Sequence, residues 1–118
     1  MAFIDVDRLK AINDSRGHAA GDRMLIEVAN ALKAQLRPYD LVIRLGGDEF
    51  ICAIVGQNLT DAKKRLALVN SALERAPERG SVTVGLAELR PGDSPEKLVA
   101  RADAALYREK DQPGSTHA

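Results

Sequence analysis

The chain has 118 residues, of which 45% are apolar and 29% charged, as expected for a single soluble domain. Seventeen basic residues balance seventeen acidic ones, which argues against a broad basic face for duplex nucleic acid. A single cysteine excludes a disulfide framework and a cysteine-based zinc cluster, and without an apolar run long enough to span a bilayer we expect a cytoplasmic domain with no membrane contact.

The first 38 residues predict a strand followed by two helices. Residues 2–5 form an apolar run that ends in an acid, typical of a strand emerging into a loop. Residues 9–17 suit one or two helical turns. Asp22 is a good N-cap for a longer helix, which Pro38 stops. The apolar residues of that helix recur at steps of three and four: Leu25, Val28, Ala29, Leu32 and Leu36.

A β-hairpin is expected next. Residues 41–45 and 50–55 are two β-rich runs, and Gly46 and Gly47 lie between them. Glycine accepts positive φ at both central positions of a tight turn, so the pair predicts a two-residue hairpin loop.

The remaining chain predicts helix, strand and helix. Thr60 is a plausible N-cap for the first helix, and Pro77 ends it. Residues 82–86 alternate as a strand does, and Ser94 with Pro95 is a strong helix start. The order β, α, α, β, β, α, β, α predicts an α+β, ferredoxin-like fold with a mostly antiparallel central sheet flanked by helices.

Three acids are candidates for a metal site. Asp5 ends the first strand, and Asp48 with Glu49 follows the glycine pair. If the hairpin lies beside the first strand, the three carboxylates converge at one sheet edge, where hard oxygens suit Mg²⁺ or Mn²⁺. A solvated acidic turn explains the hairpin residues equally well.

Two further pairs have both a binding and a structural interpretation. Asn13 and Asp22 could read the donors and acceptors of a guanine edge, although helix capping is the more common role. Arg37 and Asp40 form an Arg-x-x-Asp pair, whose arginine could bond guanine O6 and N7. A helix-terminal arginine followed by a turn aspartate is the default interpretation of that pair.

The motifs together resemble a known family. Arg44-Leu-Gly-Gly-Asp-Glu-Phe50 resembles the GGDEF signature of diguanylate cyclase domains. Residues 5–14, followed by Gly17-His18 and Gly21-Asp22, resemble the first long motif of that family, and residues 102–107 resemble its late helical motif. Three motifs in matching order make the similarity specific over almost the whole chain.

This resemblance implies an activity and a set of residues. Such domains condense two GTP molecules into cyclic di-GMP across an antiparallel homodimer, with two Mg²⁺ or Mn²⁺ ions. The implied metal ligands are Asp5, Asp48, Glu49 and the carbonyl of Val6. Asp48 is also the implied acceptor of the 3′-hydroxyl proton, with Glu49 and Arg44 as further catalytic residues. The implied GTP contacts are Arg8, Leu9, Lys10, Asn13, Asp22, Gly46, Gly47 and Lys110.

The resemblance also implies regulation, and the chain departs from the family pattern at two points. Arg37 and Asp40 match an inhibitory site for cyclic di-GMP away from the active site. A segment that normally precedes the first strand is absent, so we expect an N-terminally truncated GGDEF domain over residues 1–110 and a flexible tail over 111–118. An arginine that normally follows Lys110 is also missing. The alternative is therefore an impaired module that binds cyclic di-GMP or GTP without turnover.

Overall fold

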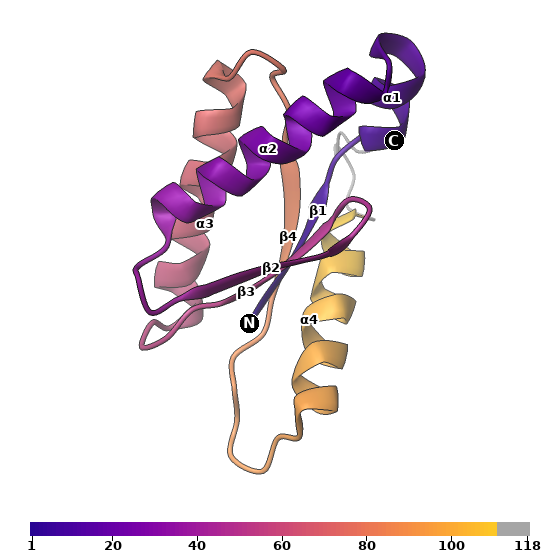
Figure 1. Ribbon diagram of the computed structural model, residues 1–118. Helices are drawn as coiled ribbons and strands as arrows, with labels where there is room; N and C mark the ends of the chain where they lie inside the picture. The colour runs from indigo at the N-terminus through magenta and orange to yellow at the C-terminus, as the bar shows by residue number, and fades with distance from the viewer. Residues whose placement is uncertain (111–118) are drawn as a thin grey trace.

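A computed structural model describes residues 1–110 of the protein, which form four strands and four helices (Figure 1). In chain order they are β1 (Ala2–Val6), α1 (Leu9–Arg16), α2 (His18–Gln35), β2 (Leu41–Gly46), β3 (Glu49–Ala53), α3 (Leu59–Arg75), β4 (Val82–Leu86) and α4 (Pro95–Lys110). The predicted tail over 111–118 lies outside the described residues.

The four strands form one antiparallel sheet in the order β2-β3-β1-β4. Phe3 is the partner of Ile51 on β3 and of Gly85 on β4, so β1 runs through the centre of the sheet. Helices on both faces complete an α+β sandwich, and the predicted ferredoxin-like fold class is confirmed.

Alternate residues of β1 supply two separate cores. Ile4 and Val6 face α2 and α3, where they join a large aliphatic cluster. The other members of that cluster include Met24, Val28, Leu32, Leu66, Val69 and Leu73. Phe3 faces the opposite way and packs with Ala102 and Leu106 of α4. Figure 1 shows α4 on its own side of the sheet, away from α2 and α3.

A glycine permits the close approach of α4 to the sheet. A Cβ built on Gly85 of β4 would lie 2.1 Å from the backbone nitrogen of Leu106 and 2.5 Å from the carbonyl oxygen of Ala102. Both neighbours are helix backbone atoms, so no side-chain rotation could make room for a larger residue.

Two predicted helix starts were wrong. The helix expected to begin after Asp22 begins at His18, because Gly17, at φ +91°, breaks the chain just before it and Ala20 is already buried in the first turn. The N-cap of α3 is Asn58 and not Thr60, since the Asn58 side chain accepts from the backbone N–H of Asp61 at 2.8 Å.

β3 is shorter than predicted, ending at Ala53 instead of residue 55. The backbone N–H of Val55 is used elsewhere: it donates to the carboxylate of Asp40 at 3.0 Å. This side-chain bond takes the donor away from the strand ladder.

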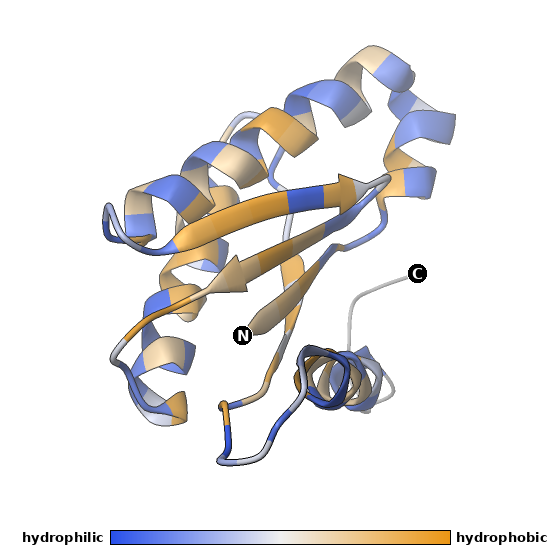
Figure 2. Ribbon diagram, turned by 60° about the horizontal axis from the view of Figure 1, so that its bottom comes forward, coloured by the Kyte–Doolittle hydropathy of each residue, from blue (hydrophilic) through white to orange (hydrophobic). Residues whose placement is uncertain are grey.

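Part of the sheet face beside α4 is uncovered. Ile51 of β3 is the register partner of both Phe3 on β1 and Ile43 on β2, so these three side chains lie on the same face of the sheet. Ile43 is nevertheless 55% exposed, and Leu41 of the same strand is 61% exposed. Figure 2 shows β2 as a largely hydrophobic ribbon at the edge of the sheet. Among residues 1–110, no helix combines the length and the apolar character needed to cross a membrane.

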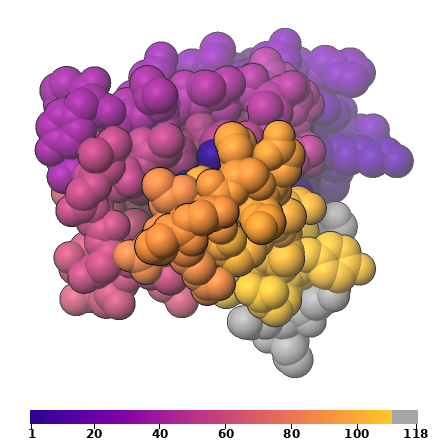
Figure 3. Space-filling model, turned by 90° about the horizontal axis from the view of Figure 1, so that it is seen from below, coloured from indigo at the N-terminus to yellow at the C-terminus, as the bar shows by residue number. Residues whose placement is uncertain are grey.

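A cleft lies at the end of the sheet where the chain begins. Its walls come from the segment after β3 and from the loop after β4, and Met1 lies in it. Figure 3 shows this side of the molecule, with the indigo of the first residues visible between the β4–α4 loop and the magenta segment. The predicted acids are at the other end of the strands.

Candidate active site

Backbone pairing brings the three predicted acids to one edge of the sheet. Asp5 is the register partner of Glu49, and the backbone N–H of Val6 donates to the carbonyl of Asp48 at 2.9 Å. The hairpin turn therefore lies directly beside the end of β1. Two segments more than 40 residues apart in the chain meet here because β1 and β3 are neighbours in the sheet.

The turn itself is shifted by one residue from the prediction. Gly46 pairs with Glu49, so Gly47 and Asp48 are the central residues, and the ladder is irregular between Arg44 and Gly46. Both glycines have positive φ, +127° and +53°. A Cβ at either would meet nothing within 4 Å, so this face of the turn is open to a ligand. The Arg44 guanidinium donates to the Gly47 carbonyl at 2.9 Å and holds the turn.

The Asp5 carboxylate is buried and only partly satisfied. It is 7% exposed, and one oxygen forms an ion pair with the ammonium of Lys110 on α4. The other oxygen, Oδ1, is buried without a hydrogen-bond partner among the described residues. An unsatisfied buried acceptor is costly, and a hard cation would remove that cost.

The donor set at this edge fits a divalent cation. Asp5, Asp48 and Glu49 supply carboxylate oxygens, and the Val6 carbonyl adds another oxygen, the ligand type that Mg²⁺ and Mn²⁺ prefer. Within residues 1–110, no three acidic, histidine or cysteine side chains are already gathered as a metal cluster. The Asp48 and Glu49 side chains would therefore have to rotate toward Asp5 to share an ion with it.

The corner between β1 and α1 approaches the same edge. Arg8 has left-handed backbone geometry, with φ +59°, and α1 begins at the next residue, Leu9. Leu9 packs against the main core, whereas Arg8 and Lys10 are exposed. The first backbone N–H groups of a helix have no partner inside it and suit phosphate oxygens.

The α1–α2 corner brings Asn13 close to the residue before Asp22. A Cβ built on Gly21 would lie 1.7 Å from the Asn13 side-chain oxygen, so the amide occupies the space that glycine leaves. Asp22 is exposed in the second turn of α2 and is not the N-cap. With the amide of Asn13 there, the corner offers donors and acceptors near the Asp22 carboxylate.

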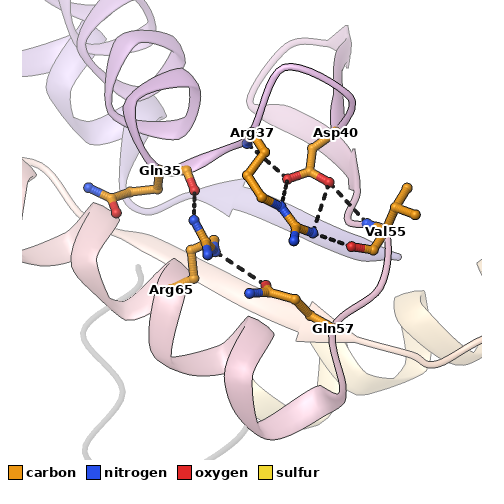
Figure 4. Close-up of polar contacts among 6 residues, drawn as sticks. All are labelled: Gln35, Arg37, Asp40, Val55, Gln57 and Arg65. Atoms are coloured by element: carbon orange, nitrogen blue, oxygen red, sulfur yellow. Dashed lines mark hydrogen bonds and ion pairs between the residues drawn. The ribbon is translucent and has the colours of Figure 1, made fainter.

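Arg37 and Asp40 lie at the opposite end of β2 from the glycine turn (Figure 4). The guanidinium of Arg37 donates to Asp40 at 3.2 Å, and its backbone N–H donates to the same carboxylate at 2.9 Å. Arg37 also donates to the carbonyl of Val55 and lies 4.7 Å from the centre of the Tyr39 ring. The pair therefore binds the start of β2 to the segment after β3.

Contacts within the Arg37–Asp40 pair favour the charged form of both side chains. Although burial by itself raises the pKa of Asp40, hydrogen bonds from Arg37 and Val55 hold it below its ordinary value. The hydrogen bond to Asp40 raises the pKa of Arg37.

Beside this pair, Arg65 of α3 donates to the Gln35 carbonyl at 2.9 Å and to the Gln57 side chain at 3.2 Å (Figure 4). Cys52, whose pKa burial raises to about 12, has no thiolate chemistry to contribute.

Asp7, Gly21 and Gly85 have structural roles that their local sequence does not indicate. Asp7 is buried and bonded to the hydroxyls of Ser81 and Thr83, more than 70 residues later. The alternation of Asp5 and Asp7 along a strand is a signal that both face one side. The residues next to Asp5 and Asp7 in the sequence do not indicate which partner each acid has, because those partners come from other parts of the chain.

The family model described as "Diguanylate cyclase, GGDEF domain" matches residues 1–116. Among curated proteins, the chain is 41% identical over 118 residues to the bifunctional diguanylate cyclase/cyclic di-GMP phosphodiesterase MucR and 42% identical over 122 residues to the diguanylate cyclase TpbB, both from Pseudomonas aeruginosa. Each match covers 93% of this chain, but only 17% of the length of MucR and 27% of the length of TpbB.

Solved structures show the same fold. The GGDEF domain of TpbB from Pseudomonas aeruginosa superposes with a TM-score of 0.85 at 39% identity, over 97% of this chain and 72% of that one. The GGDEF domain of DgcB from Caulobacter crescentus, solved in complex with cyclic di-GMP, superposes with a TM-score of 0.79 at 29% identity, over 92% and 70%. The fold is thus shared with proteins of one family.

Proposed function

This chain belongs to the GGDEF domain family of diguanylate cyclases, and we propose that it condenses two molecules of GTP into cyclic di-GMP. The observation that carries the proposal is the sheet edge where backbone pairing makes Asp5 a neighbour of Asp48 and Glu49, beside an open glycine turn. Among the described residues, Asp5 Oδ1 is buried there without a hydrogen-bond partner, which favours a cation at this edge.

Each half of the reaction forms a bond from the 3′-oxygen of one nucleotide to the α-phosphorus of the other, and breaks the bond to pyrophosphate. Asp5, Asp48, Glu49 and the Val6 carbonyl would hold Mg²⁺ or Mn²⁺. When bound, two such ions neutralise the triphosphate and polarise the α-phosphorus. A carboxylate oxygen of Asp48 accepts the 3′-hydroxyl proton, and Arg44 keeps the turn in place.

The remaining residues bind and orient GTP. Asn13 and Asp22 read the guanine edge, since an amide and a carboxylate together complement its acceptor and its donors. The β1–α1 corner receives the phosphates through Arg8, Leu9 and Lys10. Lys110 contacts them from the other side, and Gly46 and Gly47 let the backbone approach closely.

A homodimer completes the site, because each domain holds one GTP and the reaction needs two. Holding both nucleotides face to face makes the attack effectively intramolecular. We therefore expect the rate per chain to rise with protein concentration, and a monomer to be nearly inactive.

The test is incubation with GTP and Mg²⁺, followed by chromatographic separation and mass identification of the nucleotides. We expect cyclic di-GMP from the wild type and none from Asp48→Ala. Asp61→Ala removes an exposed acid of α3, beyond the far end of β3, and serves as the control. Turnover that survives in Asp48→Ala would reject this metal site.

The Arg37–Asp40 corner is proposed to bind the product, cyclic di-GMP, and to inhibit turnover. This proposal is supported by the Arg37 guanidinium, by the adjacent Tyr39 ring and by the location of the corner, which lies at the opposite end of β2 from the glycine turn. Guanine O6 and N7 would compete with Asp40 and Val55 for the guanidinium donors.

Calorimetry with cyclic di-GMP tests this second site independently of turnover. We expect binding to be lost in Arg37→Ala and kept in Arg75→Ala, an exposed arginine at the end of α3. Product binding by a wild type that makes no cyclic di-GMP would support the alternative, an impaired module without turnover. Binding unchanged in Arg37→Ala would remove this corner from the proposal.

A further inference from the structure

We propose that Asp7 is a positioning residue that fixes the phosphate-receiving corner between β1 and α1, and that it is not a metal ligand. This inference rests on the proposed function, since it concerns how the same site is held in shape. It assigns different roles to two acids that are two residues apart and look alike in the sequence.

Asp7 is buried and fully committed to two hydroxyl groups. One carboxylate oxygen accepts from Ser81 Oγ and the other from Thr83 Oγ1, each at 2.6 Å. The residue is 7% exposed. Its backbone N–H also donates to the Ser81 carbonyl at 2.9 Å, which continues the β1–β4 register one residue beyond the end of β1.

The contrast with Asp5 separates the two acids. Both are 7% exposed, but within residues 1–110 Asp5 Oδ1 has no hydrogen-bond partner, whereas each Asp7 oxygen accepts a hydrogen bond. A cation at Asp7 would have to displace two short, charge-assisted hydrogen bonds in a buried place. At Asp5 a cation would satisfy an oxygen that is otherwise unsatisfied.

The bonds of Asp7 lie where the chain changes direction. Val6, before it, is bonded to Asp48 of the glycine turn, and Arg8, after it, holds the left-handed conformation that starts α1. A non-glycine residue in that region is strained and persists only where its surroundings hold it. By bonding Ser81 and Thr83, Asp7 ties the β1–α1 corner to the start of β4. The backbone of residues 8–10 is thereby held at a fixed distance from Asp5, Asp48 and Glu49.

Asp7→Asn separates positioning from metal binding. The amide is the same size, and a rotated Ser81 or Thr83 hydroxyl accepts from its NH₂ group, so both hydrogen bonds can be kept. We expect Asp7→Asn to bind Mn²⁺, followed by electron paramagnetic resonance, and a non-hydrolysable GTP analogue within about threefold of the wild type. Asp5→Asn should lose Mn²⁺ binding.

Asp7→Ala removes the anchor, and we expect it to weaken binding of the GTP analogue by about 10- to 100-fold, since small displacements of a binding group carry losses of that size. The donor variant Ser81→Ala with Thr83→Val should reproduce the loss, and combining it with Asp7→Ala should add little. Ser81→Ala alone, expected to give a smaller loss, serves if the others fail to fold. Binding of cyclic di-GMP at the Arg37 corner should not change in any of them.

Loss of Mn²⁺ binding in a folded Asp7→Asn protein would overturn the inference and make Asp7 a ligand. Unchanged binding of the GTP analogue in Asp7→Ala would also overturn it. A wild type that binds no GTP analogue in the presence of Mn²⁺ would instead count against the proposed function, so the two failures are distinguishable.

Discussion

The ionised state of Asp40 makes stability depend on pH. Its hydrogen bonds hold the pKa in the folded protein below the ordinary value of 3.8, so between those two values the unfolded chain binds more protons. The contribution of Asp40 is therefore complete above pH 3.8 and is lost as the pH falls through the folded pKa.

We expect the free energy of unfolding in urea, measured as a function of pH below about 4, to fall less steeply in Asp40→Asn than in the wild type. The asparagine cannot gain the proton that weakens the wild-type pair. Asp103→Asn, which changes an exposed acid of α4, should keep the wild-type slope. Equal slopes in all three proteins would show that Asp40 does not carry the acid sensitivity.

Gly21 controls the position of the Asn13 amide. A Cβ at residue 21 would overlap the Asn13 oxygen, so Gly21→Ala has to push that side chain away from Asp22. We expect GTP analogue binding to weaken by about 1–2 kcal/mol, the loss of one or two hydrogen bonds to guanine. In an Asn13→Ala background the same change should cost little, because nothing remains to be displaced. Additive losses in the double variant would contradict this explanation.

At the scale of the element, α3 begins because of one side-chain cap. Asn58 accepts from the N–H of Asp61, while Thr60 lies inside the helix. We expect Asn58→Ala to lower the free energy of unfolding by about 1 kcal/mol, measured in urea. Thr60→Ala should change it by a few tenths at most. The reverse order of the two losses would restore Thr60 as the cap.

α4 is held to the sheet by a contact that tolerates no side chain. Because a Cβ on Gly85 would overlap the backbone of Leu106 and Ala102, Gly85→Ala has to separate α4 from β4. We expect a loss of about 3 kcal/mol or more in the free energy of unfolding, at the upper end for overpacked cores. Since Lys110 at the end of α4 forms an ion pair with Asp5, the variant should also disturb the sheet edge that carries Asp5, Asp48 and Glu49. An unchanged unfolding midpoint would show that α4 can shift without cost.

At the scale of the whole molecule, the uncovered part of the sheet is an association hazard. Leu41 and Ile43 are exposed on β2, the edge strand of the described sheet, where an apolar face and backbone groups without a neighbouring described strand occur together. We expect Leu41→Thr with Ile43→Thr to lower the weight-average sedimentation coefficient at high concentration, with little change in Tm. Ile26→Gln, which changes a single exposed apolar residue on α2, should leave association as it is. Association that persists in the threonine variant would place the contact elsewhere.

The sequence by itself determined the order and type of all eight elements. These follow from local properties, because apolar periodicity, glycines at a turn and prolines at helix ends act within a few residues. The family followed from the resemblance of three motifs to the GGDEF pattern. The first residue of each helix does not follow from local sequence in the same way, because several neighbouring residues can act as its N-cap. Asp22 and Thr60 are good caps in isolation, but the start of α2 follows the break at Gly17, and Asn58 supplies the bond for α3.

Only the tertiary structure decided which partner each acid has. Asp5 and Asp7 are alike in the sequence, yet one meets Lys110 of α4 and the other meets Ser81 and Thr83 at β4. Those partners lie more than 70 residues away, and sheet register together with helix packing brings them within bonding distance. A local pattern carries no information on such pairs, because the free energy of each contact depends on groups that only the folded chain assembles.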